Sequence, residues 1–163
     1  MIAQKQIQKT MLSLLEEYTG CPAVPANTTK KMPAYPYISF SVINADTRKG
    51  TYSVYGNTKA MPLNLKYSFT IQSDDDAEAL MIAMKAKDFF EEAKRLELAD
   101  NDIIVADVGA ITPRDNLITI EYEYRKGLDV TLRLVNVISD TNEDTIDAAT
   151  LTSNAGTINL EKE

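Results

Sequence analysis

Apolar residues recur every three or four positions in two stretches of the chain, and this spacing predicts two helices. The first helix lies in residues 2–18, and the second runs over residues 77–98, which are rich in Ala, Met, Lys, Glu and Leu. At about 1.5 Å per residue, the second helix should be roughly 35 Å long. Its apolar stripe is expected to comprise Leu80, Met81, Met84, Phe89, Phe90, Ala93 and Leu96.

Alternation of apolar and polar residues predicts strands on both sides of the central helix. These strands are expected over residues 37–43, 63–71, 102–108, 117–124 and 128–138. The Arg-Lys-Gly triplet at 125–127 should form a turn or bulge between the last two strands. The order of elements predicts an α+β fold, in which a mainly antiparallel sheet packs with an N-terminal helix and one long central helix.

Three segments interrupt these patterns. Residues 20–36 contain four of the six prolines and should form a stiff loop. Residues 44–62 hold basic residues and tyrosines without clear alternation, and long loops of this kind tend to be functional or flexible. Residues 139–163 are polar and acidic. We therefore expect a single α+β domain over residues 1–138 and, over residues 139–163, an acidic polar C-terminal extension that orders only against a partner.

The bulk composition is that of one globular domain. No apolar run approaches the roughly 18 residues of a membrane span, and the charged N-terminal segment is not expected to be a signal peptide. Cys21 is the only cysteine, so no disulfide can form within the chain. A reducing cytosol is the expected environment.

The residue types that catalysis needs are largely missing. The sequence has no histidine, the commonest general base and metal ligand. Cys21 therefore cannot belong to a Cys–His pair, and there is no nucleophile elbow, Gly-rich phosphate loop or CxxC motif. We predict that the protein is not an enzyme and holds no cofactor.

Two acidic clusters could in principle hold a metal ion. Asp74, Asp75 and Asp76 could ligate Mg²⁺ or Mn²⁺, but with Ser73 as an N-cap they are equally explained as acids at the start of a helix. The DTNED stretch at 140–144 begins like an EF-hand loop, but Thr and Leu occupy the later positions that need Gly and Glu. We favour the helix cap, with a metal-dependent enzyme as the alternative.

The net charge of −7 is unevenly distributed. Residues 1–72 carry eight Lys and Arg against three Asp and Glu, a net charge of +5, whereas residues 73–163 carry nine against 21, a net charge of −12. Either this asymmetry serves only solubility, or it makes successive copies of the protein complementary. A basic nucleic-acid-binding patch is disfavoured because the sequence pI is near 4.7.

A head-to-tail contact between copies would set the basic half of one chain against the acidic half of the next. Two tyrosines of the 44–62 segment are expected to anchor such an interface, or to lie in the core, because Tyr buries a large amphipathic surface. The residues expected at this interface are Arg48, Lys49, Tyr52, Tyr55, Lys59, Glu121, Glu123 and Asp129.

Three stretches contain recognisable sequence motifs: YPYISFSV (35–42), FTIQSDDDAEALMIAMKAKDFF (69–90) and DIIVADVGAITPRDNLITIEYEYRKGLDVTLRL (102–134). They include a polar strand-to-helix junction, a P-R-D turn and the EYEYRKGLDV run. Together these stretches resemble the neck or tail terminator proteins of tailed bacteriophages. The resemblance covers about residues 35–138 and includes no catalytic residue.

The resemblance implies a structural virion protein that forms a ring, usually of six subunits, which caps the tail tube and joins it to the neck and head connector. Its expected partners are other copies of the chain, tail-tube proteins and neck proteins, with no membrane. Genome DNA would pass through the ring without specific binding, since an acidic lumen repels phosphate. The expected location is the virion neck or tail, after assembly in the host cytoplasm. Another tail or head–tail connector component, or a non-viral regulatory binding module, is the alternative.

Overall fold

A computed structural model describes residues 4–48, 50–56, 58–115, 123–139, 148–153 and 156–161. Its elements are α1 (Gln4–Thr19), β1 (Ala23–Pro25), β2 (Tyr37–Arg48), β3 (Ser53–Tyr55), β4 (Thr58–Ser73), α2 (Asp76–Asp88), the π-helical segment η1 (Phe89–Ala93), α3 (Arg95–Asp100), β5 (Ile104–Val108), β6 (Thr112–Pro113), β7 (Tyr124–Ser139), β8 (Ala148–Ser153) and β9 (Gly156–Glu161).

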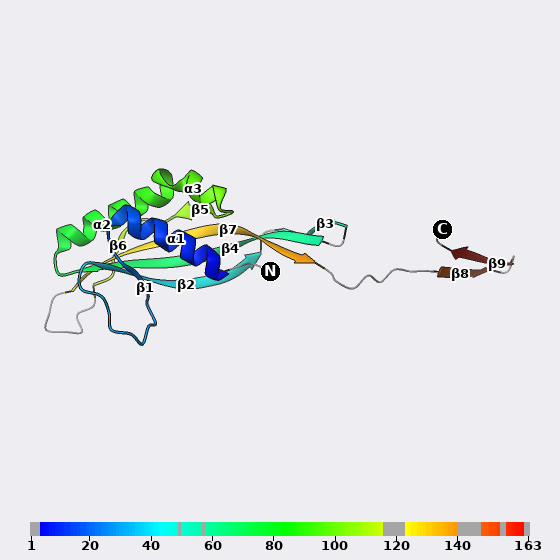
Figure 1. Cartoon of the computed structure of the whole chain (residues 1–163), viewed down its shortest axis with the longest axis horizontal. Coiled ribbons are helices and arrows are strands. Elements are labelled where there is room, and N and C mark those ends of the chain that lie inside the picture. The colour runs from blue at the N-terminus through cyan, green and yellow to red at the C-terminus, as the bar shows by residue number, and fades with distance from the viewer. Residues whose placement is uncertain are drawn as a thin grey trace.

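The fold is α+β, built on a seven-stranded and mostly antiparallel sheet (Figure 1). The strand order is β1-β2-β4-β7-β5, with β3 paired to β4 and β6 paired to β7. Among the described strands, β1 and β2 form the single parallel pair. The predicted fold class is therefore confirmed. None of the described helices is long and apolar enough to cross a membrane.

The core lies between the sheet and a layer made by α1 and α2, which are side by side over one face (Figure 1). Alternate residues of the central strands point into this core because successive side chains of a strand face opposite sides. The predicted alternation is confirmed in residues 63–71 and 128–134, whereas Ile138, the predicted end of the inward face, is 40% exposed. Fully buried members of the core include Met11, Leu15, Tyr67, Phe69, Phe89, Phe90, Leu128, Val130 and Leu132.

The central helix is shorter than predicted, and it turns a different face to the core. It spans 18 residues, 13 in α2 and five in η1, and the chain breaks at Lys94 (φ −122°, ψ 12°) before α3 begins. The side chains expected in its apolar stripe at positions 80, 81 and 84 are 42–54% exposed. Small residues instead face the sheet, because they let the helix lie close to α1 and β7. The buried residues of α2 are Ala79, Ile82, Ala83 and Ala86.

Two consecutive aromatic residues begin the π-helical segment. Phe89 and Phe90 each have an exposed fraction of 0%. The wider turn of η1 changes the helical phase by inserting an extra residue. The two rings meet edge to face, with their centroids 4.8 Å apart.

The strands are longer than the sequence pattern predicts. β4 and β7 each have 16 residues and pair along their whole length, from Thr58 with Ser139 to Ser73 with Tyr124. The predicted loop at 44–62 is therefore mainly strand, shared by the end of β2, β3 and the start of β4. The turn predicted at 125–127 is wrong, because these residues lie inside β7 opposite β4. Residues 117–122 of another predicted strand lie outside the described residues.

The long strand pair extends beyond the helical layer. Sixteen strand residues span about 50 Å, whereas the 18-residue helix spans about 27 Å. We call the uncovered part the arm, which consists of β3, Thr58–Pro62 of β4 and Val135–Ser139 of β7. Figure 1 shows the arm projecting from the end of the sheet opposite the start of α2.

One further strand and a hairpin lie in segments predicted as loop or tail. β1, within the predicted proline-rich loop, pairs Val24 with Ser39 of β2. In the C-terminal extension, β8 and β9 pair with each other and not with the seven-stranded sheet. The predicted division of the chain at residue 138 stays a prediction.

Candidate functional site

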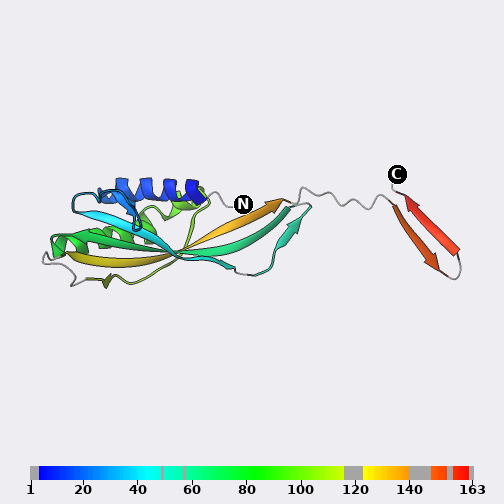
Figure 2. The ribbon, with the colours of Figure 1, turned by 90° about the horizontal axis from the view of Figure 1, so that it is seen from below.

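One face of the sheet is not covered by the helices (Figure 2), and it carries polar side chains such as Thr70, Gln72 and Arg125. Successive side chains of a strand point to opposite faces of the sheet. The residues that alternate with the core residues therefore point to this face. A hollow of about 580 Å³ lies over this face, with Ala26 and Met32 of the loop before β2 on one side. The remaining residues that line it are Tyr37, Ser39, Thr70, Gln72, Arg114 and Arg125.

Arg114 attaches the segment around β6 to strand β7. Its backbone N–H donates to the Arg125 carbonyl (2.9 Å), and its guanidinium donates to the Asp129 carboxylate (2.6 Å), Ser68 Oγ and Thr70 Oγ1 (3.3 Å). The side chain passes directly over Gly127, where a Cβ atom would lie 1.8 Å from Arg114 Nε. Glycine at this position therefore makes room for the arginine.

Asp129 is the centre of this cluster. Ser68 Oγ donates to its carboxylate at 2.9 Å, and Lys66 Nζ lies 3.2 Å from its other oxygen. Burial opposes ionisation of the carboxyl, but the hydrogen bonds from Arg114, Ser68 and Lys66 outweigh it and lower the pKa of Asp129. The carboxylate is thus charged and fully engaged at neutral pH.

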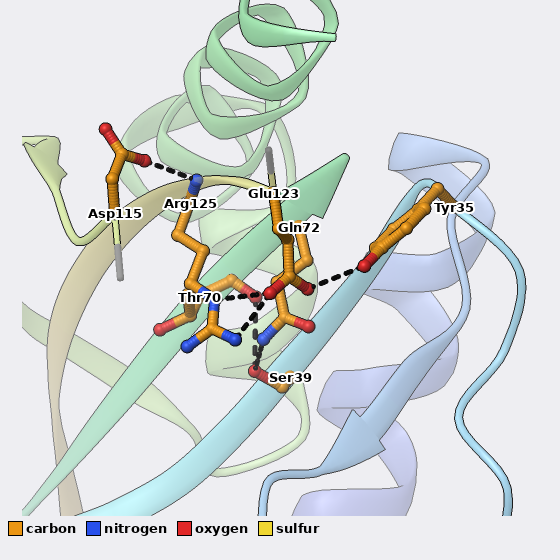
Figure 3. A network of polar contacts seen from close by, with 7 residues as sticks. All are labelled: Tyr35, Ser39, Thr70, Gln72, Asp115, Glu123 and Arg125. Atoms are coloured by element: carbon orange, nitrogen blue, oxygen red, sulfur yellow. Dashed lines mark hydrogen bonds and ion pairs between the residues drawn. The ribbon is translucent and has the colours of Figure 1, made fainter. Parts of the chain in front are cut away.

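A second cluster lies beside the first on the same face, around Arg125, four residues before Asp129 on β7 (Figure 3). Arg125 donates from Nε to Glu123 Oε2 at 2.9 Å, and Tyr35 donates its hydroxyl to Glu123 Oε1 at 2.9 Å. Partial burial and the hydrogen bond to Glu123 raise the pKa of Tyr35 to about 12, so the phenol stays protonated. Asp115 accepts the backbone N–H of Arg125 at 2.7 Å. The two clusters hold β6 and the loop before β2 to the sheet.

These polar groups are paired with one another and are not arranged for catalysis. Among the described residues, no buried side-chain nitrogen or oxygen lacks a hydrogen-bond partner. Arg114 and Arg125 line the hollow, but Asp129 and Glu123 neutralise their charges. Cys21 is buried in the core, where burial and then the charge of Glu78 raise the pKa of its thiol. A thiol with a raised pKa is a poor nucleophile.

The acidic cluster at 74–76 acts at a helix start, although the predicted cap is off by two residues. Ser73 ends β4 and is not the N-cap of α2. Asp75 is the N-cap: its carboxylate accepts the N–H groups of Ala77 (2.8 Å) and Glu78 (3.1 Å). Ser73 Oγ instead donates to Glu78 and accepts the Asp75 N–H. Within the described ranges, no cluster of three or more acidic or cysteine residues is arranged to hold a metal ion.

The arm exposes apolar side chains, as an interaction surface does. Its most exposed ones are at the tip, where Val54 is 62% and Tyr55 is 73% exposed. Val135, Val137 and Ile138 of β7 are 39–59% exposed. No helix covers them because the helical layer ends before the strands do.

An apolar hollow of about 520 Å³ lies where the arm leaves the body. We call it the notch. β5 begins here, with Ile104 paired to Arg133 of β7. The notch is lined by Gln6, Ile7, Pro62, Asn101, Asp102, Ile104, Arg133, Leu134, Val135 and Val137.

The predicted interface residues lie in two separate places. Tyr55 and Lys59 lie in the arm, with Tyr52 half-buried just before it. Glu123 and Asp129 lie on the polar face, where their carboxylates already bind Arg125 and Arg114. Asp129 pairs with Ser68, nine residues along β4 from Lys59, or about 30 Å. Lys49 and Glu121 lie outside the described residues, as does the side chain of Arg48. The interface role of all eight stays a prediction.

Sequence reasoning missed Arg114 and the notch. The P-R-D phrase and the glycine at 127 were visible signals for Arg114, but only the pairing of β6 with β7 brings them together. The notch had no local signal, since its walls come from α1, β5 and β7.

A sheet whose polar groups bind one another, with an arm that exposes Val54 and Tyr55, is consistent with a structural assembly protein. Residues 9–159 match the family described as phage neck terminator protein, and the chain belongs to this family. It is therefore a non-enzymatic structural component of the phage neck or tail, and it associates with other components there. The match extends beyond residues 35–138, which carry the resemblance in the sequence. No curated protein matches the chain.

Proposed function

We propose that the protein forms a ring of identical subunits, six in number, that ends the tail tube and joins it to the neck and head connector. The observation that carries this proposal is the projecting arm, with its exposed Val54 and Tyr55, on a protein of the neck terminator family. Its partners would be other copies of itself, the last ring of the tail tube and the neck proteins above it. Assembly would occur in the host cytoplasm.

The charge of the chain supports passage of DNA through such a ring. The whole protein carries a net charge of −7. Binding to a DNA backbone gains affinity when Lys and Arg neutralise phosphates, so a channel lined with acidic residues holds DNA weakly. The paired arginines of the polar face are consistent with this role, because Asp129 and Glu123 cancel their charge.

The proposal is tested on tails that lack this protein. Purified wild-type protein, added to tail tubes from a phage with the gene deleted, should appear by negative-stain microscopy as a ring at one end of each tube. Treated tails should then join DNA-filled heads in vitro. Protein that is heat-unfolded before addition is the control. A protein that stays monomeric at high concentration and leaves the tube ends bare would overturn the proposal.

A further inference from the structure

We infer that neighbouring copies meet through opposite edges of the sheet, so that the loop carrying Lys30 and Lys31 in one copy lies on an acidic groove beside β5 of the next. We call residues 26–33 the basic loop and the hollow beside β5 the β5 groove. This inference deepens the proposed ring and rests on it. It names the contact that joins the subunits and the charges that orient it.

The two surfaces lie at opposite edges of one sheet. In the strand order β1-β2-β4-β7-β5, four inter-strand spacings of about 4.8 Å separate β1 from β5, or roughly 19 Å. Figure 1 shows the basic loop extending from the edge formed by β1 and β2, with β5 and α3 along the opposite edge. The loop therefore points away from the β5 groove of its own chain. A second copy is needed to bring the two surfaces together.

The β5 groove is acidic. It lies between β5 and the end of the central helix, has a volume of about 330 Å³ and takes its charge from Glu91, Glu92, Arg95 and Asp107, a net of −2. Glu91 is already paired with a lysine of α2. Glu92 and Asp107 are exposed, and neither forms an ion pair with another described residue. These two carboxylates are available to cations from another molecule.

The basic loop carries the matching charge. Lys30 and Lys31 are the only charged residues in positions 18–45, which gives that segment a net charge of +2. Both lysines are exposed. Residues 91–107, which include one wall of the groove and β5 up to Asp107, contain six acidic and two basic residues, a net charge of −4. Opposite charges of this kind determine which surfaces meet and in which orientation.

A second copy is the occupant that this arrangement favours. Each chain has one basic loop and one β5 groove, so a head-to-tail contact between copies uses both in equal numbers. Such a contact closes into a ring when the rotation per subunit divides a full turn.

The contact is made by side chains and not by strand addition, because both sheet edges are unsuited to pairing. On β1, the backbone N–H of Ala23 donates to Glu16 Oε1 at 2.7 Å, and Pro25 has no N–H. On β5, the register shifts between Val105 and Asp107, and irregular, charged edge strands resist pairing with another sheet.

Apolar side chains beside the charges add to the contact. Leu96 directly follows Arg95 on α3 and is 79% exposed, more than any other large apolar side chain among the described residues. Met32 directly follows the two lysines and is 37% exposed. Exposed ion pairs contribute little individually, so burial of these apolar side chains supplies affinity while the charges set the orientation.

Crosslinking tests the contact without removing its charges. The double variant Thr29→Cys/Ala106→Cys, at two exposed positions, should give a ladder of covalent oligomers with a short bismaleimide. A mixture of the two single variants should give dimers only. Thr29→Cys/Met81→Cys, whose second cysteine is on the outer face of α2, is the control and should give no ladder. The wild-type background is low because Cys21 is buried. Rings without a Thr29→Cys/Ala106→Cys ladder would overturn this inference alone, whereas absence of wild-type rings would overturn the proposed function with it.

Charge reversal tests the pairing itself. Lys30→Glu/Lys31→Glu should weaken self-association about tenfold or more, measured by sedimentation equilibrium, and Glu92→Lys/Asp107→Lys should do the same. All four positions are exposed, so circular dichroism should match that of the wild type. The variant that combines the four changes should regain most of the association.

Lys5→Glu/Lys9→Glu, at exposed positions of α1, makes the same change in net charge and is the control. It should leave self-association close to that of the wild type. An equal loss in this control, or no recovery in the four-residue variant, would contradict docking of the basic loop on the β5 groove.

Discussion

Arg114 and Gly127 show how two residues far apart in the chain depend on each other. The arginine reaches Asp129 and Ser68 only by lying across the backbone at position 127. A glycine inside a strand normally weakens it, since there is no side chain to pack. Here the arginine side chain fills that space, and its charge is balanced by Asp129. The pair thus fastens β6 to the polar face of the sheet.

This dependence predicts that the stability costs of mutating Arg114 and Gly127 are not additive in a double-mutant cycle. Arg114→Ala should lower the free energy of unfolding by about 2 kcal/mol, because it removes hydrogen bonds to a charged partner. Gly127→Ala should cost a similar amount by forcing Arg114 out of place, while in the Arg114→Ala background it should cost less than about 0.5 kcal/mol. Urea denaturation of the four proteins measures the cycle. Fully additive costs would show that the two positions act independently.

Asp129 predicts a specific dependence of stability on pH. Its folded pKa lies below the ordinary value of 3.8, so the folded state holds the proton less tightly than the unfolded state. The stabilisation is therefore fully present above pH 3.8 and is lost as the pH falls through the folded pKa. The difference in unfolding free energy between wild type and Asp129→Asn should shrink over that acidic range. Asp100→Asn, at the exposed end of α3, removes a carboxylate outside this cluster and is the control.

At the scale of elements, the mismatch between strand and helix length produces the arm. A strand gains about 3.3 Å per residue and a helix 1.5 Å, so helices of similar residue number cover only part of a long strand pair. β4 and β7 remain paired beyond the cover because each supplies the other's backbone hydrogen bonds. Their side chains are then left exposed to solvent or to a partner. The arm is therefore where neighbouring molecules can add contacts.

The start of α2 gives a prediction at the same scale. Asp75→Ala should lower the unfolding free energy by about 1 kcal/mol, since it removes the acceptor of two helix N–H groups. Asp74→Ala removes the same charge one residue earlier and should change the unfolding free energy by less than about 0.5 kcal/mol. Thermal unfolding followed by circular dichroism measures both. Calorimetric titration with Mg²⁺ or Mn²⁺ should show no specific site. A micromolar site abolished by Asp75→Ala would favour metal binding instead.

At the scale of the whole molecule, the two oppositely charged halves are interleaved in one sheet. Lys66 and Arg125 belong to different halves of the sequence, and yet both bind carboxylates of the polar face. Part of the charge asymmetry is therefore satisfied inside the fold. Charge available for contacts between copies must come from other positions, such as the exposed Asp100 and Asp102.

Self-association should accordingly depend only modestly on salt. Raising the ionic strength from 0.1 M to 1 M shortens the screening length from about 10 Å to about 3 Å. Exposed ion pairs contribute about 0–1 kcal/mol each, so one or two pairs should change the dissociation constant by roughly tenfold or less. Sedimentation equilibrium at the two salt concentrations measures this change. A change of several hundredfold would mean that charge, and not apolar burial, holds the copies together.

The sequence alone determined the α+β class, the alternating core of β4 and β7 and the absence of catalytic residue types, because these depend on local periodicity and composition. It also contained the phrases that resemble the neck terminator family. Only the tertiary structure decided which face of α2 is buried: Ala79 and Ala83 are fully buried against the core, whereas Met81 and Met84 are exposed. Likewise, Arg114 meets Gly127, and Ile7 and Ile104 line one hollow, only because the fold brings distant segments together, which no local pattern encodes.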